Sequence, residues 1–156
     1  MLKQFSYQFI AGPFPTREEL QGDWQIGNCR RALQYYVLQS KGLFLKPDEV
    51  LSPGAYHKTG TFVFKKGEKI DLGALKTGDI IYAERIRSKA GELVDKSEQG
   101  FPTEDDYITS LHTAIWIGEP GKEIWHSTAV EGSSCSWVLG RFQYFYRIVA
   151  AKRITT

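Results

Sequence analysis

The sequence contains few of the residues from which metal clusters and disulfide frameworks are built. Its 156 residues include two cysteines and three histidines, too few for a disulfide framework or a four-thiolate zinc site. The 20 Lys and Arg nearly balance the 18 Asp and Glu. A net charge of +2 does not indicate a nucleic-acid partner. No apolar run approaches the roughly 20 residues of a membrane span, so we expect no membrane partner either.

The amino-terminal segment Met1–Ser6 shows no apolar leader followed by a small-residue cleavage site, and this pattern predicts a cytoplasmic protein. The length fits one domain. The composition, 42% hydrophobic and 13% aromatic, is typical of a folded chain. We therefore expect a single domain spanning residues 1–156.

Helix signals concentrate in the first third of the chain. The pattern Thr16–Glu19 predicts a capping box that begins a short helix. Asn28 occupies an N-cap position before the main predicted helix, Cys29–Ser40, and Gly42 ends it. Lys46–Glu49, with proline at its second position, predicts another short helix.

Strand patterns fill most of the remainder. Alternating or β-rich runs predict strands at 5–9, 61–64, 80–85, 111–117, 123–128 and 141–154. Residues 86–110 are polar and without periodicity, and they are long for a connection inside a domain, so we expect an irregular insertion there. A helical front half followed by an antiparallel sheet predicts an α+β fold.

Cys29 is the first candidate catalytic residue. A thiol in the first turn of a helix faces unpaired backbone N–H groups and the positive end of the helix dipole, which both favour thiolate. Arg30 and Arg31 oppose the dipole there, yet their charge would lower the pKa of a neighbouring thiol. The alternative is that Cys29 is a small buried hydrophobic residue on the apolar helix face.

His112 and His126 are the second candidates, because a predicted hairpin joins them. They lie 14 residues apart. A connecting loop of odd length places them on one face of the sheet within about 8 Å, whereas an even loop places them on opposite faces. Together with Cys29 they supply a nucleophile, a base and a group that orients the base. The alternatives are one core and one surface histidine, or a less common three-ligand zinc site. We expect neither a metal nor a cofactor.

Four segments, in this order, resemble the NlpC-like cysteine peptidases of the papain-like clan, bacterial enzymes that cleave peptidoglycan stem peptides. The segments are Gly27-Asn28-Cys29-Arg30-Arg31-Ala32-Leu33, Leu75-Lys76-Thr77-Gly78-Asp79, His112-Thr113-Ala114-Ile115-Trp116-Ile117-Gly118 and His126-Ser127-Thr128. The resemblance runs from about Asp23 to Ile154.

The resemblance implies a papain-like fold, in which an N-terminal helix carrying the cysteine packs against an antiparallel, partly barrel-like sheet. It implies a cysteine peptidase or amidase with Cys29 as nucleophile, His112 as general base and acid, and His126 as orienting residue. The substrate would be a small peptide or cell-wall fragment, and the origin bacterial or phage. The same thioester chemistry would also serve an acyl or amide transferase.

The chain also departs from the family pattern. Asn28-Cys29-Arg30-Arg31 stands where the family has Asp-Cys-Ser-Gly, and its upstream oxyanion-hole tyrosine has no counterpart. The backbone N–H of Cys29 could be one oxyanion donor, with Gln25 or Trp24 as candidates for the second. These departures keep open a degenerate, non-catalytic binding module.

The remaining cysteine and histidine have simpler interpretations. Cys135 has no helix start beside it, which favours a structural thiol; in rearranged relatives, where the cysteine follows the histidine, it would be the nucleophile. His57 lies in a Gly- and Pro-rich turn, which predicts a solvent-exposed side chain. The sequence does not predict the oligomeric state.

Overall fold

The structure is a computed structural model that describes residues 2–8, 15–45, 60–93, 112–119 and 121–154. The predicted short helix at Lys46–Glu49, His57, and residues 94–110 of the predicted insertion lie outside the described residues, as does Phe9 of the first predicted strand.

Two helices, α1 (Arg17–Gln21) and α2 (Cys29–Lys41), begin where the sequence predicts. The capping box is present at α1: the Thr16 hydroxyl accepts a hydrogen bond from the Glu19 N–H, and the Glu19 carboxylate accepts one from the Thr16 N–H, each at 3.2 Å. The Asn28 side chain accepts from the Arg31 N–H at 3.0 Å and so caps α2. These local signals fix the position of Cys29 in the first turn of α2.

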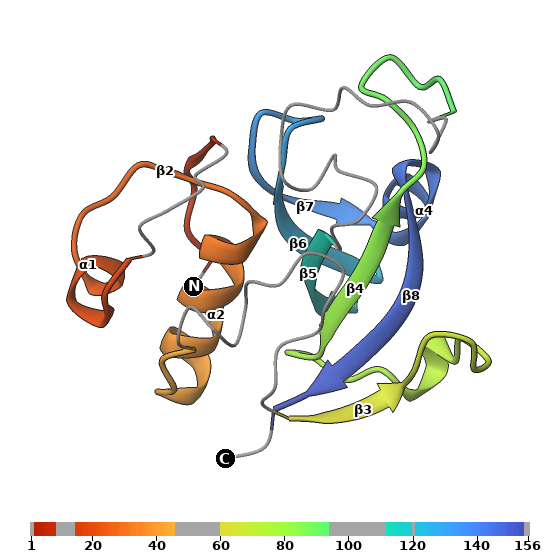
Figure 1. The fold of residues 1–156 in the computed structure, drawn as a ribbon, viewed down its shortest axis with the longest axis horizontal. Helices are drawn as coiled ribbons and strands as arrows, with labels where there is room; N and C mark the ends of the chain where they lie inside the picture. Colours follow the sequence, from red (N-terminus) through yellow and green to blue (C-terminus); the bar gives the residue numbers. More distant parts are fainter. Residues whose placement is uncertain (1, 9–14, 46–59, 94–111, 120, 155–156) are drawn as a thin grey trace.

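Eight strands form one curled sheet of half-barrel shape (Figure 1), in the order β2-β1-β7-β6-β5-β4-β8-β3. Their bounds are β1 Ser6–Tyr7, β2 Ile26–Gly27, β3 Thr61–Phe64, β4 Ile80–Arg85, β5 His112–Gly118, β6 Glu123–Thr128, β7 Ser133–Val138 and β8 Tyr146–Arg153. The sheet is mixed, because β1 and β2 pair in parallel while the other neighbouring strands pair antiparallel. The α+β class is confirmed, and the expectation of a purely antiparallel sheet is wrong at this edge.

The predicted strand over 141–154 is wrong in its first part. Residues Leu139–Phe145 form the helix α4, and β8 begins only at Tyr146. Phe142 and Phe145, three residues apart, are both buried, whereas Tyr144 is 47% exposed. Three closely spaced aromatic residues fit a helix with one buried stripe as well as they fit a strand, and packing decides between the two.

Helices cover the sheet on both faces (Figure 1). On the α2 face, residues of α2 pack against Ile80, Tyr82, Ile115 and Trp125. On the α4 face, residues of α4 pack against Ile81, Ala83, Ala114 and Trp116. Along β5, therefore, odd-numbered side chains point to the α2 face and even-numbered ones to the α4 face, as strand geometry requires.

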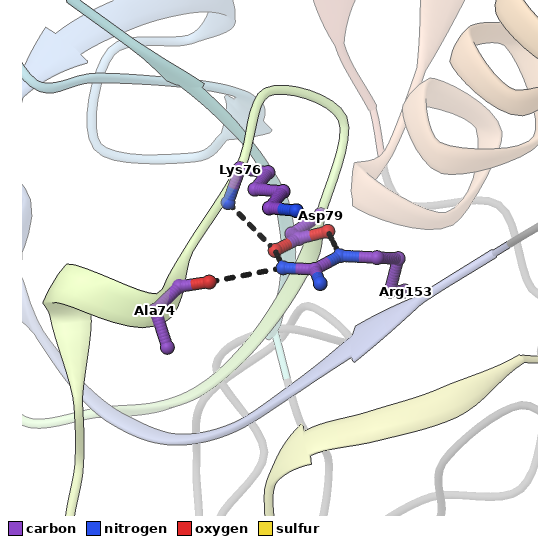
Figure 2. A network of polar contacts seen from close by, with 4 residues as sticks. All are labelled: Ala74, Lys76, Asp79 and Arg153. Carbon is purple, nitrogen blue, oxygen red and sulfur yellow. Dashed lines mark hydrogen bonds and ion pairs between the residues drawn. The ribbon is translucent and has the colours of Figure 1, made fainter.

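An ion pair joins the start of β4 to the end of β8 (Figure 2). The Arg153 guanidinium donates to both oxygens of Asp79, at 2.8 and 2.7 Å, and to the Ala74 carbonyl at 2.9 Å. The Lys76 N–H donates to the same carboxylate at 2.8 Å. The Asp79 side chain is 2% exposed, and a buried carboxylate is tolerated only with such compensation. Asp79 thus connects the Leu75–Asp79 segment to β8 through its ion pair with Arg153.

Within the described ranges, no helix is long and apolar enough to cross a membrane.

The Asp79–Arg153 pair gives a test of the fold. Asp79→Ala should lower the free energy of unfolding by about 3 kcal/mol, because it leaves a partly buried guanidinium and a loop amide without their acceptor. Arg141→Ala, which breaks the exposed Arg141–Glu131 pair, should change it by at most about 0.5 kcal/mol. Urea denaturation measures both, and equal losses would contradict the structural role given to Asp79.

Candidate functional site

The β5–β6 hairpin places both candidate histidines on one face. Ile115 pairs with Trp125 and Trp116 with Ile124, a register in which His112 and His126 are diagonal neighbours. The connection, 119–122, is even in length, which alone would separate the two side chains. A bulge between Trp116 and Gly118 adds one residue to β5 and restores the same-face arrangement. The predicted proximity of the two histidines is confirmed. It results from the bulge in β5 and not from an odd loop length.

The two imidazoles are joined directly. His112 Nε2 and His126 Nδ1 lie 2.7 Å apart, and both side chains are fully buried. His112 stacks on Tyr146 with ring centroids 4.2 Å apart, and His126 meets Trp137 edge-on at 4.5 Å. A hydrogen bond between two ring nitrogens needs a proton on one and a lone pair on the other, so the tautomer of one ring determines that of the other. A base and its orienting group have this relation.

Cys29, the first residue of α2, is 1% exposed, and buried hydroxyls hold its segment against the hairpin. The Thr113 hydroxyl donates to the Cys29 carbonyl at 3.2 Å, and the Ser127 hydroxyl donates to the Gly27 carbonyl at 3.0 Å. Thr113 and Ser127 each directly follow one of the histidines. The structure therefore brings the cysteine segment to the same part of β5 and β6 as the histidine pair.

The side chains nevertheless lie on different faces. Thr113 points to the α2 face, where its hydroxyl meets Cys29, so His112, its neighbour in the strand, points to the α4 face and packs on Tyr146. His126 likewise packs on Phe142 of α4. In this conformation the sheet lies between the α2 face, which carries Cys29, and the imidazole pair. The direct Cys29–His112 contact expected from the sequence stays a prediction.

Arg31 is directed away from the thiol. Its guanidinium donates to the Ile26 carbonyl at 3.1 Å and lies over the Trp24 ring at 5.4 Å, and burial lowers its pKa. A Cβ on Gly27 would come within 2.8 Å of Arg31 Cδ, so any larger residue at position 27 would displace this side chain. Arg31 thus stabilises the turn before α2 through these two contacts. They explain why an arginine stands in the first turn of a helix, where its charge opposes the helix dipole.

The two oxyanion candidates are differently placed. The single N–H of the Trp24 indole donates to the Leu20 carbonyl at 3.0 Å, and indole has no second donor. The assignment of Trp24 as an oxyanion donor stays a prediction. The Gln25 amide donates to Asp23 at 2.9 Å on the surface. The Gln25 amide has a second N–H that could donate to an oxyanion. The assignment of Gln25 as an oxyanion donor therefore stays a prediction.

Cys135, rather than Cys29, shares a face with the histidines. It pairs with His126 across β6 and β7 and packs, half-buried, against the α4-face core. Burial, followed by the Glu131 carboxylate, raises the pKa of the Cys135 thiol to about 12, while the Arg141 guanidinium acts in the opposite direction. A thiol with such a pKa is almost wholly protonated at neutral pH, which supports the interpretation of Cys135 as a structural thiol.

Sequence reasoning missed Thr113 and Ser127. Both stand at α2-facing positions of strands whose other α2-facing residues include Ile115 and Trp125. A hydroxyl at such a position is costly unless it is hydrogen-bonded, and this signal could have identified them.

No protein-family model matches this sequence, and no curated protein matches it significantly. Among the described residues, no three His, Cys, Asp or Glu side chains are grouped to hold a metal ion.

The raised pKa of Cys135 predicts its reactivity. In a Cys29→Ser background, the rate of iodoacetamide labelling of Cys135 should rise about tenfold per pH unit from about pH 7 to about pH 10 without levelling, because only the thiolate reacts. Glu131→Gln should raise the rate at every pH, since it removes the carboxylate that disfavours the thiolate. A plateau near pH 8.5, the region of an ordinary thiol, would refute this environment for Cys135.

Proposed function

We propose that this chain is a thiol hydrolase of papain-like architecture that cleaves an amide bond in a small peptide, of the kind found in peptidoglycan stems. The observation that supports it best is the docking of the Gly27–Cys29 segment on β5 and β6 by Thr113 and Ser127, each one residue from a member of the hydrogen-bonded histidine pair. The substrate class rests on the sequence resemblance.

In the proposed reaction the Cys29 thiol transfers its proton to His112, and the thiolate attacks the scissile carbonyl carbon. The resulting oxyanion accepts a hydrogen bond from the backbone N–H of Cys29. His112 then returns the proton to the leaving amine, and a thioester forms as the C–N bond breaks. Water, deprotonated by His112, hydrolyses the thioester and restores the thiol. In the described conformation His126 orients the His112 ring through the hydrogen bond between them.

This mechanism has one structural requirement. The imidazole of His112 lies on the α4 face in the described conformation, so it must turn to the α2 face to reach Cys29. His112 is the first residue of β5. Such a turn needs the release of its terminal ladder pair with Ala83, of its hydrogen bond to His126 and of its stacking on Tyr146. Thr113 can stay bonded to the Cys29 carbonyl while this happens. The described conformation is thus the resting state of the proposed enzyme.

A non-catalytic binding module is the second candidate function, and the orientation of the histidines favours it. The two imidazoles pack in the core against Tyr146, Phe142 and Trp137. A binding module, unlike the hydrolase, does not require His112 to leave this position. Under this interpretation, Cys29 is a small buried residue in the first turn of α2.

Limited labelling with iodoacetamide near neutral pH separates the two functions. Accessibility alone favours Cys135, because Cys29 is the more buried thiol. Activation of Cys29 by its helix and by His112 would reverse that order. The hydrolase predicts that Cys29 is labelled first and that His112→Gln abolishes this preference; peptide mapping by mass spectrometry gives the order.

Turnover supplies the companion measurement. With a digest of peptidoglycan stem peptides, Cys29→Ser should lower the rate of amine release at least about 1000-fold, as removal of a nucleophile does. Cys135→Ser, the matched control, should leave the rate unchanged. If Cys135 is labelled first and Cys29→Ser matches the parent, the hydrolase is rejected in favour of the binding module.

A further inference from the structure

Thr113 and Ser127 form a hydroxyl clamp on the amino-terminal end of α2. Thr113 lies on β5 and Ser127 on β6, both buried, and their hydroxyls bond carbonyls two residues apart in the chain, those of Cys29 and Gly27. The Gly27 carbonyl also accepts from the Gln8 N–H at 3.1 Å, so both of its lone pairs have donors. The segment that carries the thiol is thereby fixed to two strands.

The choice of residue at these two positions is informative. Valine and alanine have nearly the same shapes as threonine and serine and would suit strand positions that face an apolar core. The hydroxyls replace some apolar contact with two directional bonds, both made to backbone atoms. Their geometry therefore depends on the position of the Gly27–Cys29 backbone rather than on any side chain there.

We propose that Thr113 and Ser127 are positioning residues that hold the Cys29 backbone in register with the histidine pair. This inference rests on the proposed function and extends it to residues that do not touch substrate. Thr113 and Ser127 each follow a histidine directly in the sequence. A shift of α2 along the sheet therefore changes the distance that the turned His112 ring must span to reach Cys29. Misplacement of a catalytic group by about 1 Å can cost about 100-fold in rate, which sets the scale of the effect.

The chain offers a matched control in Ser134. Its hydroxyl is equally buried, accepts from the Phe5 N–H at 2.9 Å and donates to the Lys3 carbonyl at 2.8 Å. It therefore binds the segment leading into β1 to β7 by the same kind of bond, and it is the ladder partner of Ser127 but bonds neither Gly27 nor Cys29. Ser134→Ala should reduce stability comparably while it leaves both clamp bonds, those of Thr113 and Ser127, intact.

The experiment compares Thr113→Val, Thr113→Ser, Ser127→Ala and Ser134→Ala. Turnover of the stem-peptide digest, the pH profile of Cys29 labelling and the urea midpoint are measured for each. Thr113→Val and Ser127→Ala should lower kcat about 10- to 100-fold with little change in KM, and should move the labelling profile of Cys29 to higher pH. Thr113→Ser should recover most of the activity, and Ser134→Ala should alter only the midpoint.

If Thr113→Val and Ser127→Ala change kcat and the labelling profile no more than Ser134→Ala does, the clamp is a purely structural feature and the inference is overturned while the hydrolase stands. If the parent shows no turnover that Cys29→Ser removes, the proposed function has failed and the inference fails with it.

Discussion

Side-chain alternation along β5 and β6 is the constraint on which the rest of this site depends. On each strand a histidine and a hydroxyl residue are neighbours in sequence and therefore point to opposite faces. The imidazoles meet each other on the α4 face, and the hydroxyls reach the backbone of the cysteine segment on the α2 face. The β5–β6 hairpin thus supplies polar contacts on both faces of the sheet.

The framework around this hairpin is built to keep its register. The bulge before Gly118 sets the parity of the two strands, and β4 holds β5 on the other side through four antiparallel pairs. The Asp79–Arg153 pair ties β4 to β8 (Figure 2), and β8 carries Tyr146, on which His112 stacks. The ion pair, although far from Cys29 in the sequence, therefore supports the surface on which the histidine pair lies.

The sequence predicts the local features of this fold well and its long-range features less well. The caps at Thr16 and Asn28 and the strand Ile80–Arg85 depend on neighbouring residues alone, and they are found as expected. The helix Leu139–Phe145 was missed because packing of Phe142 and Phe145, rather than local pattern, selects helix there. The alternation of side chains along a hairpin predicts whether His112 and His126 share a face. It predicts nothing about the position of either histidine relative to Cys29. Which face of the sheet receives α2 is decided by tertiary packing.

The hydrogen bond between His112 and His126 joins the two residues into one pair, and both candidate functions depend on it. Nuclear magnetic resonance of the ¹⁵N-labelled imidazoles tests it directly through the nitrogen–nitrogen coupling across an N–H···N bond. We expect a coupling between Nε2 of His112 and Nδ1 of His126 that disappears in His126→Gln. Absence of this coupling from the spectrum of the parent protein would contradict the hydrogen bond.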